Sequence, residues 1–95
     1  MSLALEDYRP LGASGLKVSK LWLGTMMFGD RCDEAEAARI VAASRDTGLN
    51  AIDTADVYAR GVSEEILGRV LQANGRRDEV VLATKGVATM GPGPN

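Results

Sequence analysis

Three short apolar segments recur along the chain at a nearly constant interval, and this repeat restricts the possible folds more than any other feature. The segments are Leu21–Thr25, Asn50–Thr54 and Val80–Lys85, and each begins about thirty residues after the previous one. That interval is the length of one strand–helix–strand unit. The repeat therefore predicts three parallel strands that are joined by helices through right-handed crossovers.

Two helices are predicted between the strands. The first spans Asp33–Thr47, with a capping pattern at its start and Gly48 after its end. The second is expected to be capped by Ser63 and to end at Gly75. The expected buried positions are Ala37, Ile40, Val41 and Ser44 in the first helix and Ile66, Leu67, Val70 and Leu71 in the second.

The predicted order of elements is compatible with two architectures. A hairpin comes first, with Tyr8–Gly12 and Lys17–Ser19 as its arms and Gly15 in its turn. If the strands lie in sequence order, both helices cover one face, and closure into a (β/α)8 barrel covers the other. Such a barrel needs about 250 residues, so residues 1–95 would be the N-terminal part of one barrel domain, incomplete as given and inactive alone. The alternative is a small open α/β sheet with strand order 2-1-3 and helices on both faces.

The composition restricts the expected partners. The 13 acidic residues slightly outnumber the 11 basic ones, which disfavours binding to nucleic acid or to an anionic membrane. Cys32 is the single cysteine and the chain has no His, so neither an internal disulfide nor a transition-metal site is expected. We see no secretory signal and no apolar run of about 20 residues. These features predict a cytoplasmic protein whose partners are small molecules or proteins.

The rim formed by the carboxyl ends of the strands is where a barrel carries its reactive groups. This rule selects Gly24, Thr25 and Met26 after the first strand, Asp53 and Tyr58 after the second, and Lys85 at the end of the third. Neighbouring strands lie about 4.8 Å apart, so we expect Asp53 and Lys85, at equivalent strand ends, to form an ion pair.

The combination of Tyr58, Lys85 and Asp53 suits the reduction of an aldehyde or ketone. A lysine cation about 4 Å from a phenolate contributes about 4 kcal/mol at an effective dielectric constant near 20, which makes a tyrosine an effective acid near neutral pH. Asp53 would hold the cation in place. Each residue also has a purely structural interpretation, with Asp53 in a turn, Tyr58 as a surface aromatic and Lys85 as a solvated charge.

Seven segments between Tyr8 and Lys85 resemble the aldo-keto reductase family in order and spacing, and this coverage makes the resemblance highly specific. One of them is Asn50-Ala-Ile-Asp-Thr-Ala-Asp-Val-Tyr58. The others are Tyr8-Arg-Pro-Leu-Gly12, Ser14-Gly-Leu-Lys-Val-Ser19, Leu23-Gly-Thr-Met26, Phe28-Gly29, Ser63-Glu-Glu-Ile-Leu-Gly68 and Ala83-Thr-Lys85. The hairpin segment is most similar to the bacterial branch of the family that also includes potassium-channel β-subunits.

The resemblance implies a (β/α)8 barrel that reduces carbonyl groups with NADPH. It implies that Asp53, Tyr58 and Lys85 are three members of a catalytic tetrad, and that Gly24, Thr25, Met26 and Asp53 lie beside the cofactor. Ala59 departs from the family pattern, which commonly has Gly there. The branch implies a second possibility, a nicotinamide-binding regulatory subunit with little turnover.

The fourth tetrad member, a His, is absent from this sequence. We therefore expect the natural sequence to continue past Asn95 and to supply a His at the end of the next strand, roughly thirty to forty-five residues after Lys85. Sequencing the full reading frame tests this expectation. A stop codon directly after Asn95, or a continuation without a strand-end His in that window, would contradict the reductase interpretation.

Overall fold

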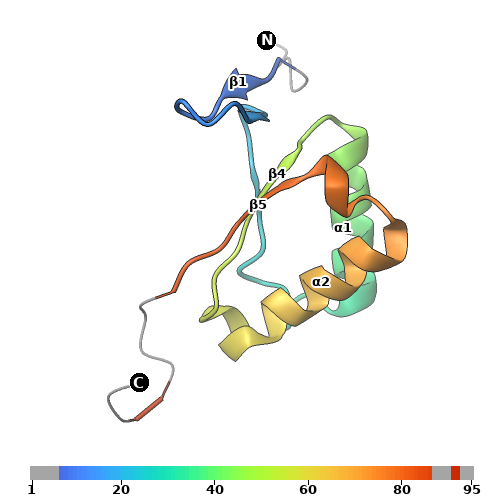
Figure 1. Cartoon of the computed structure of the whole chain (residues 1–95). Helices are drawn as coiled ribbons and strands as arrows, with labels where there is room; N and C mark the ends of the chain where they lie inside the picture. The colour runs from blue at the N-terminus through green and yellow to red at the C-terminus, as the bar shows by residue number, and fades with distance from the viewer. Residues whose placement is uncertain (1–6, 87–90, 93–95) are drawn as a thin grey trace.

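The computed structural model describes residues 7–86 and 91–92. A hairpin is followed by a three-stranded sheet, and two α-helices lie together on one side of that sheet (Figure 1). In chain order the elements are β1 (Arg9–Pro10), β2 (Lys17–Val18), β3 (Leu23–Gly24), α1 (Glu34–Asp46), β4 (Ala51–Asp53), the 3-10 turn η1 (Tyr58–Gly61), α2 (Val62–Asn74), the 3-10 turn η2 (Arg77–Glu79) and β5 (Val81–Ala83).

The three strands of the larger sheet are parallel and lie in sequence order, β3-β4-β5. Gly24 pairs with Asp53, which pairs in turn with Ala83, so the carboxyl ends of the strands are aligned. This order confirms the arrangement expected for a barrel and excludes the 2-1-3 order of the open sheet. Each strand is shorter than predicted, since β3 ends at Gly24, β4 at Asp53 and β5 at Ala83.

The start of α1 is as predicted, whereas the start of α2 is not. The backbone N–H of Glu36 donates to Oδ1 of Asp33 at 2.8 Å and caps α1. At the end of α2, Gly75 has a φ of 70°, a left-handed conformation that glycine adopts without strain. The expectation that Ser63 caps α2 is wrong, because the helix begins at Val62, two residues earlier than a cap at Ser63 requires, and Gly61 takes the cap position.

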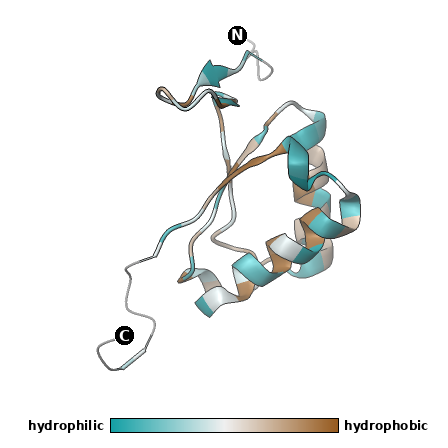
Figure 2. Ribbon diagram, in the orientation of Figure 1, coloured by the Kyte–Doolittle hydropathy of each residue, from teal (hydrophilic) through white to brown (hydrophobic). Residues whose placement is uncertain are grey.

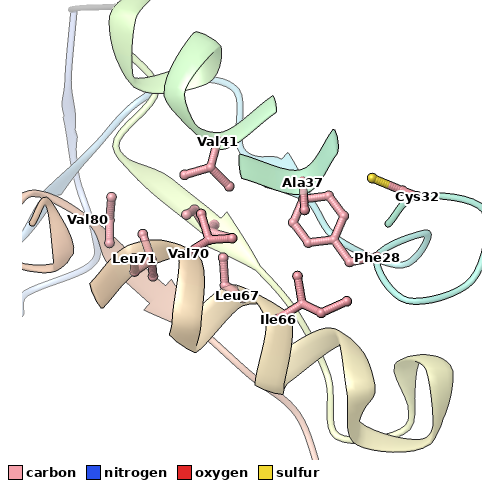
Figure 3. Close-up of a cluster of buried hydrophobic side chains, with 10 residues drawn as sticks. Phe28, Cys32, Ala37, Val41, Ile66, Leu67, Val70, Leu71 and Val80 are labelled. Atoms are coloured by element: carbon pink, nitrogen blue, oxygen red, sulfur yellow. The ribbon is translucent and has the colours of Figure 1, made fainter. Parts of the chain in front are cut away.

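Both helices pack their apolar faces on the sheet and form one hydrophobic core with it (Figure 3). Val41 of α1, Ile52 of β4 and Leu67 and Leu71 of α2 are each at most 2% exposed. The predicted positions of α2 are all buried, as are Ala37 and Val41 of α1, while Ile40 and Ser44 are partly buried. The 3.6-residue periodicity of the sequence therefore identified the face of each helix that meets the sheet.

The opposite face of the sheet is more open. The ribbon of β5 is hydrophobic along its length (Figure 2), yet all three of its residues are only half-buried. Leu82 packs against the core, whereas Val81 and Ala83 alternate to the other side. Among residues 7–86 and 91–92, no helix covers that side. An apolar strand that is half-exposed fits a sheet whose second face is the interior of a barrel.

The hairpin is attached at the amino-terminal ends of the strands through Asn50. Oδ1 of Asn50 accepts from the backbone N–H of Ser19 at 2.7 Å, and its Nδ2 donates to the carbonyl of Lys17 at 2.8 Å. The hydroxyl of Tyr8 donates to the carbonyl of Gly48 at 3.0 Å. The carboxyl-terminal ends of the strands therefore form a separate rim, away from the hairpin.

Replacing Leu67 by Ala is expected to lower the free energy of unfolding by about 2–5 kcal/mol, because the side chain is 1% exposed and its loss leaves a cavity under both helices. Leu16→Ala is the matched control. Leu16 is 48% exposed in the hairpin, so its loss should change stability by about 0.5 kcal/mol or less. Denaturant unfolding of the full-length protein measures both, and equal losses would contradict the core described above.

Candidate functional site

Asp53 and Lys85 form an ion pair at the carboxyl-terminal rim of the sheet. Nζ of Lys85 lies 2.8 Å from Oδ1 of Asp53. The expected equivalence of their positions is wrong, since Asp53 pairs with Ala83 and Lys85 lies two residues further on. Alternate residues of an extended chain face the same side, so this offset leaves Lys85 on the face of the sheet that carries Asp53.

A second acceptor and an aromatic ring complete the surroundings of Lys85. Its Nζ donates to the carbonyl of Thr54 at 2.7 Å and lies 5.2 Å from the centroid of the Tyr58 ring. The hydrogen bond to Asp53 is the main reason that the pKa of Lys85 is raised above its ordinary value of 10.5, and Tyr58 contributes in the same direction. Lys85 is therefore a cation throughout the neutral pH range.

Tyr58 begins the tight turn η1 and does not lie in an open loop. The next three residues, Ala59, Arg60 and Gly61, have φ values of 49°, 54° and 95°. Such left-handed conformations are uncommon for residues with a Cβ atom. Glycine would adopt the φ of residue 59 without strain, whereas Ala59 is held in a conformation that is unfavourable for a residue with a Cβ atom.

Gly24 and Met26 present open surface beside this cluster. Gly24 pairs with Asp53 in the sheet, is exposed, and has no heavy atom within 4 Å of where a Cβ atom would lie. Met26 is 57% exposed just after the end of β3. Next to the carboxylate of Asp53, the rim therefore offers open space at Gly24 and an exposed apolar side chain at Met26.

Thr25 also lies at the rim, but its side chain is directed into the protein. It is 1% exposed, and its hydroxyl donates to the carbonyl of Asp53 at 3.1 Å. Ser63, which is fully buried, donates from Oγ to the carbonyl of Thr25 at 2.8 Å. This contact of Ser63 joins residues 38 positions apart, so no local pattern in the sequence signals it.

Other potential sites lie apart from this cluster. Cys32 is buried against the core, and burial raises the pKa of its thiol, which disfavours the reactive thiolate. Within the described ranges, no group of His, Cys, Asp or Glu is arranged to hold a metal ion, and no helix is long and apolar enough to cross a membrane. A groove of about 500 Å³ between α1 and α2 contains none of the candidate residues.

Known proteins match this chain over most of its length. The sequence model of the Aldo/keto reductase family matches residues 20–95. A protein of Arabidopsis thaliana, named as a probable voltage-gated potassium channel subunit beta, is 47% identical over 91 residues, which is 94% of this chain and 27% of the relative. An uncharacterized oxidoreductase of Bacillus subtilis is 45% identical over 84 residues, 83% of this chain and 26% of the relative.

The backbone matches solved structures as well. The aldo-keto reductase AKR11C1 from Bacillus halodurans, in its holo form, has a TM-score of 0.71 and 43% identity over 81% of this chain and 24% of its own. The chain spans about a quarter of the length of the curated relatives described above. With its sequence and its parallel, sequentially ordered strands both matched, the chain belongs to the aldo-keto reductase family and has the fold of part of a (β/α)8 barrel.

Proposed function

We propose that the protein is an oxidoreductase that reduces aldehydes or ketones to alcohols with NADPH. The observation that carries the proposal is the position of Lys85 Nζ, 2.8 Å from the Asp53 carboxylate and 5.2 Å from the centroid of the Tyr58 ring. Membership of the aldo-keto reductase family supports an oxidoreductase activity. Because the chain spans about a quarter of its relatives, the activity is proposed for the full-length protein.

Each of the three residues has one task in this proposal. Tyr58 donates the proton of its hydroxyl to the carbonyl oxygen of the substrate, while the carbonyl carbon accepts a hydride. The cation of Lys85 stabilises the phenolate that is left behind. Asp53 holds that cation at the rim together with the carbonyl of Thr54, and the raised pKa of Lys85 keeps it charged while the reaction proceeds.

The rim residues fit a nicotinamide cofactor. Gly24 leaves open space where a side chain would otherwise stand, and exposed Met26 offers an apolar contact for a flat ring. Gly24, Met26 and Asp53 would hold this end of the cofactor, and Thr25 would support them from below. When bound, the cofactor supplies the hydride. NADPH is the form that the family resemblance implies.

The proposed partner is a small carbonyl compound, and the proposed location is the cytoplasm. A single buried cysteine is compatible with a reducing compartment.

A second candidate function is a nicotinamide-binding regulatory subunit with little turnover. It is favoured by the 47% identity to a protein that is named as a probable potassium channel subunit. A cofactor-consumption assay on the full-length protein with a panel of aldehydes separates the two functions. Sustained turnover supports the reductase, whereas tight cofactor binding without turnover supports the regulatory subunit.

Replacing Tyr58 by Phe should lower kcat/KM for carbonyl reduction by about 10²–10⁴-fold and leave the Kd of NADPH nearly unchanged, because the hydroxyl acts in the chemical step. Tyr8→Phe is the matched control. It removes the hydroxyl of the other tyrosine of residues 1–95, whose hydrogen bond to Gly48 lies in the hairpin attachment. Near wild-type turnover of the Tyr58 variant would remove Tyr58 from the mechanism.

Replacing Lys85 by Met should slow reduction by about 10²-fold or more at pH 7, whereas Lys85→Arg should retain more activity because it keeps a cation. Lys20→Met removes a lysine that pairs with Asp7 at 3.2 Å, and controls for the loss of charge.

Since the pKa of Lys85 is raised, its ion pair is fully formed below pH 10.5 and is lost only as the pH rises through the raised value. The charge of Lys85 itself therefore does not change between about pH 6 and 9. A rate of reduction at pH 7 that stays close to that of the wild type in the Met variant would contradict the role of the cation.

A further inference from the structure

Thr25 touches both ends of the chain segment that carries Tyr58. Residues 54–62 lie between Asp53, the last residue of β4, and Ser63, the second residue of α2, and Tyr58 is in the middle of them. At the start of this segment, the hydroxyl of Thr25 donates to the carbonyl of Asp53 at 3.1 Å. At its end, Oγ of Ser63 donates to the carbonyl of Thr25 at 2.8 Å and lies 3.3 Å from the Thr25 hydroxyl. Thr25, directly after β3, is therefore hydrogen-bonded to the residues on both sides of the segment 54–62, and so links its two ends.

Both hydroxyls of this closure are withdrawn from water. Ser63 is 0% exposed and Thr25 is 1% exposed. A hydrogen bond in such surroundings is electrostatically stronger than one in water, and removing one partner leaves the other polar group unsatisfied. These hydrogen bonds are shielded from water, whereas the ion pairs on the surface of α1 and α2 stay largely solvated.

The enclosed segment needs such a constraint because its backbone is strained. Ala59 and Arg60 follow Tyr58 with φ values of 49° and 54°, and residues with a Cβ atom hold this conformation only when the surrounding structure enforces it. The neighbouring loop packs closely on the same turn, since a Cβ atom on Gly29 would meet Val62 at 2.7 Å and Ala59 at 3.3 Å. The start of the segment is also held by the backbone N–H of Thr54, which donates to Ala83 at 2.8 Å. The hydrogen bonds of Thr25, in contrast, join the two ends of the segment to one residue.

We propose that Ser63 is a positioning residue, which through Thr25 closes residues 54–62 and holds Tyr58 beside Lys85. The proposal rests on the reductase function proposed above, in which Tyr58 donates a proton. The series of hydrogen bonds runs from Ser63 to Thr25, to Asp53 and to Lys85, and so joins α2 to the ends of β3, β4 and β5. Ser63 touches none of the reacting atoms and acts only through this series.

Hydrogen exchange in the full-length protein tests the closure without any need for activity. Ser63→Ala should raise the exchange rates of the amides of Asp56 and Arg60 by roughly threefold or more, because their hydrogen bonds to Lys85 and Val57 lie within the released segment. Ser44→Ala is the matched control. Its hydroxyl donates to Val41 at 2.8 Å within α1, so its loss should affect exchange in α1 and leave the rim unchanged.

Kinetics on the same variants test the positioning. Ser63→Ala should lower kcat by roughly 5- to 50-fold, since a small displacement of a reacting group is costly, and should change the Kd of NADPH by less than about twofold. Ser44→Ala should change neither. If Ser63→Ala does not fold, Ser63→Cys keeps the size of the side chain and replaces the hydroxyl by a weak donor, and is measured in the same way.

Unchanged exchange at Asp56 and Arg60 in the Ser63 variant would overturn the closure. Faster exchange with an unchanged kcat would overturn the positioning role. Absence of turnover in the wild-type protein would count against the proposed reductase function, and the exchange measurement would still decide whether Ser63 closes the segment.

Discussion

The parallel register of three strands is the constraint on which the candidate site depends. Because Gly24, Asp53 and Ala83 lie side by side, the segments that follow the strands begin at the same edge of the sheet. Residues that are about thirty positions apart in sequence are thereby brought within hydrogen-bonding distance of one another. The core beneath the sheet fixes this register, since a shift by one residue would turn Ile52 away from the helices and Asp53 into them.

The rim combines side chains that are held in place by hydrogen bonds with a surface that is exposed to solvent. Lys85 is held by the carboxylate of Asp53, the last residue of β4, and by the carbonyl of Thr54, which follows it, so its charge is tied to the strand that precedes Tyr58. Thr25 and Ser63 are buried beneath, while Gly24 is exposed at the surface. Rigid support below an accessible surface is the arrangement that a catalytic site requires, because reacting groups must keep their geometry while ligands enter and leave.

Local features of this fold could be predicted from the sequence, and contacts between distant segments mostly could not. The cap at Asp33 and the buried faces of both helices follow from short-range patterns, and the structure has them. The ion pair of Asp53 and Lys85 was expected from the order of the strands, although the assumed register was off by two residues. Ser63 does not cap α2 as its local sequence predicts, because its hydroxyl has a buried partner across the fold that outweighs the local preference for capping.

The central claim is that Lys85 acts through Tyr58. It is tested most directly by kcat/KM for carbonyl reduction in four forms of the full-length protein: wild type, Lys85→Met, Tyr58→Phe and the double variant. If the cation acts only by stabilising the phenolate of Tyr58, its removal costs little once the hydroxyl is gone, and the double variant should be about as active as Tyr58→Phe alone. Losses that multiply in the double variant would show that the two residues act independently, and would contradict the account.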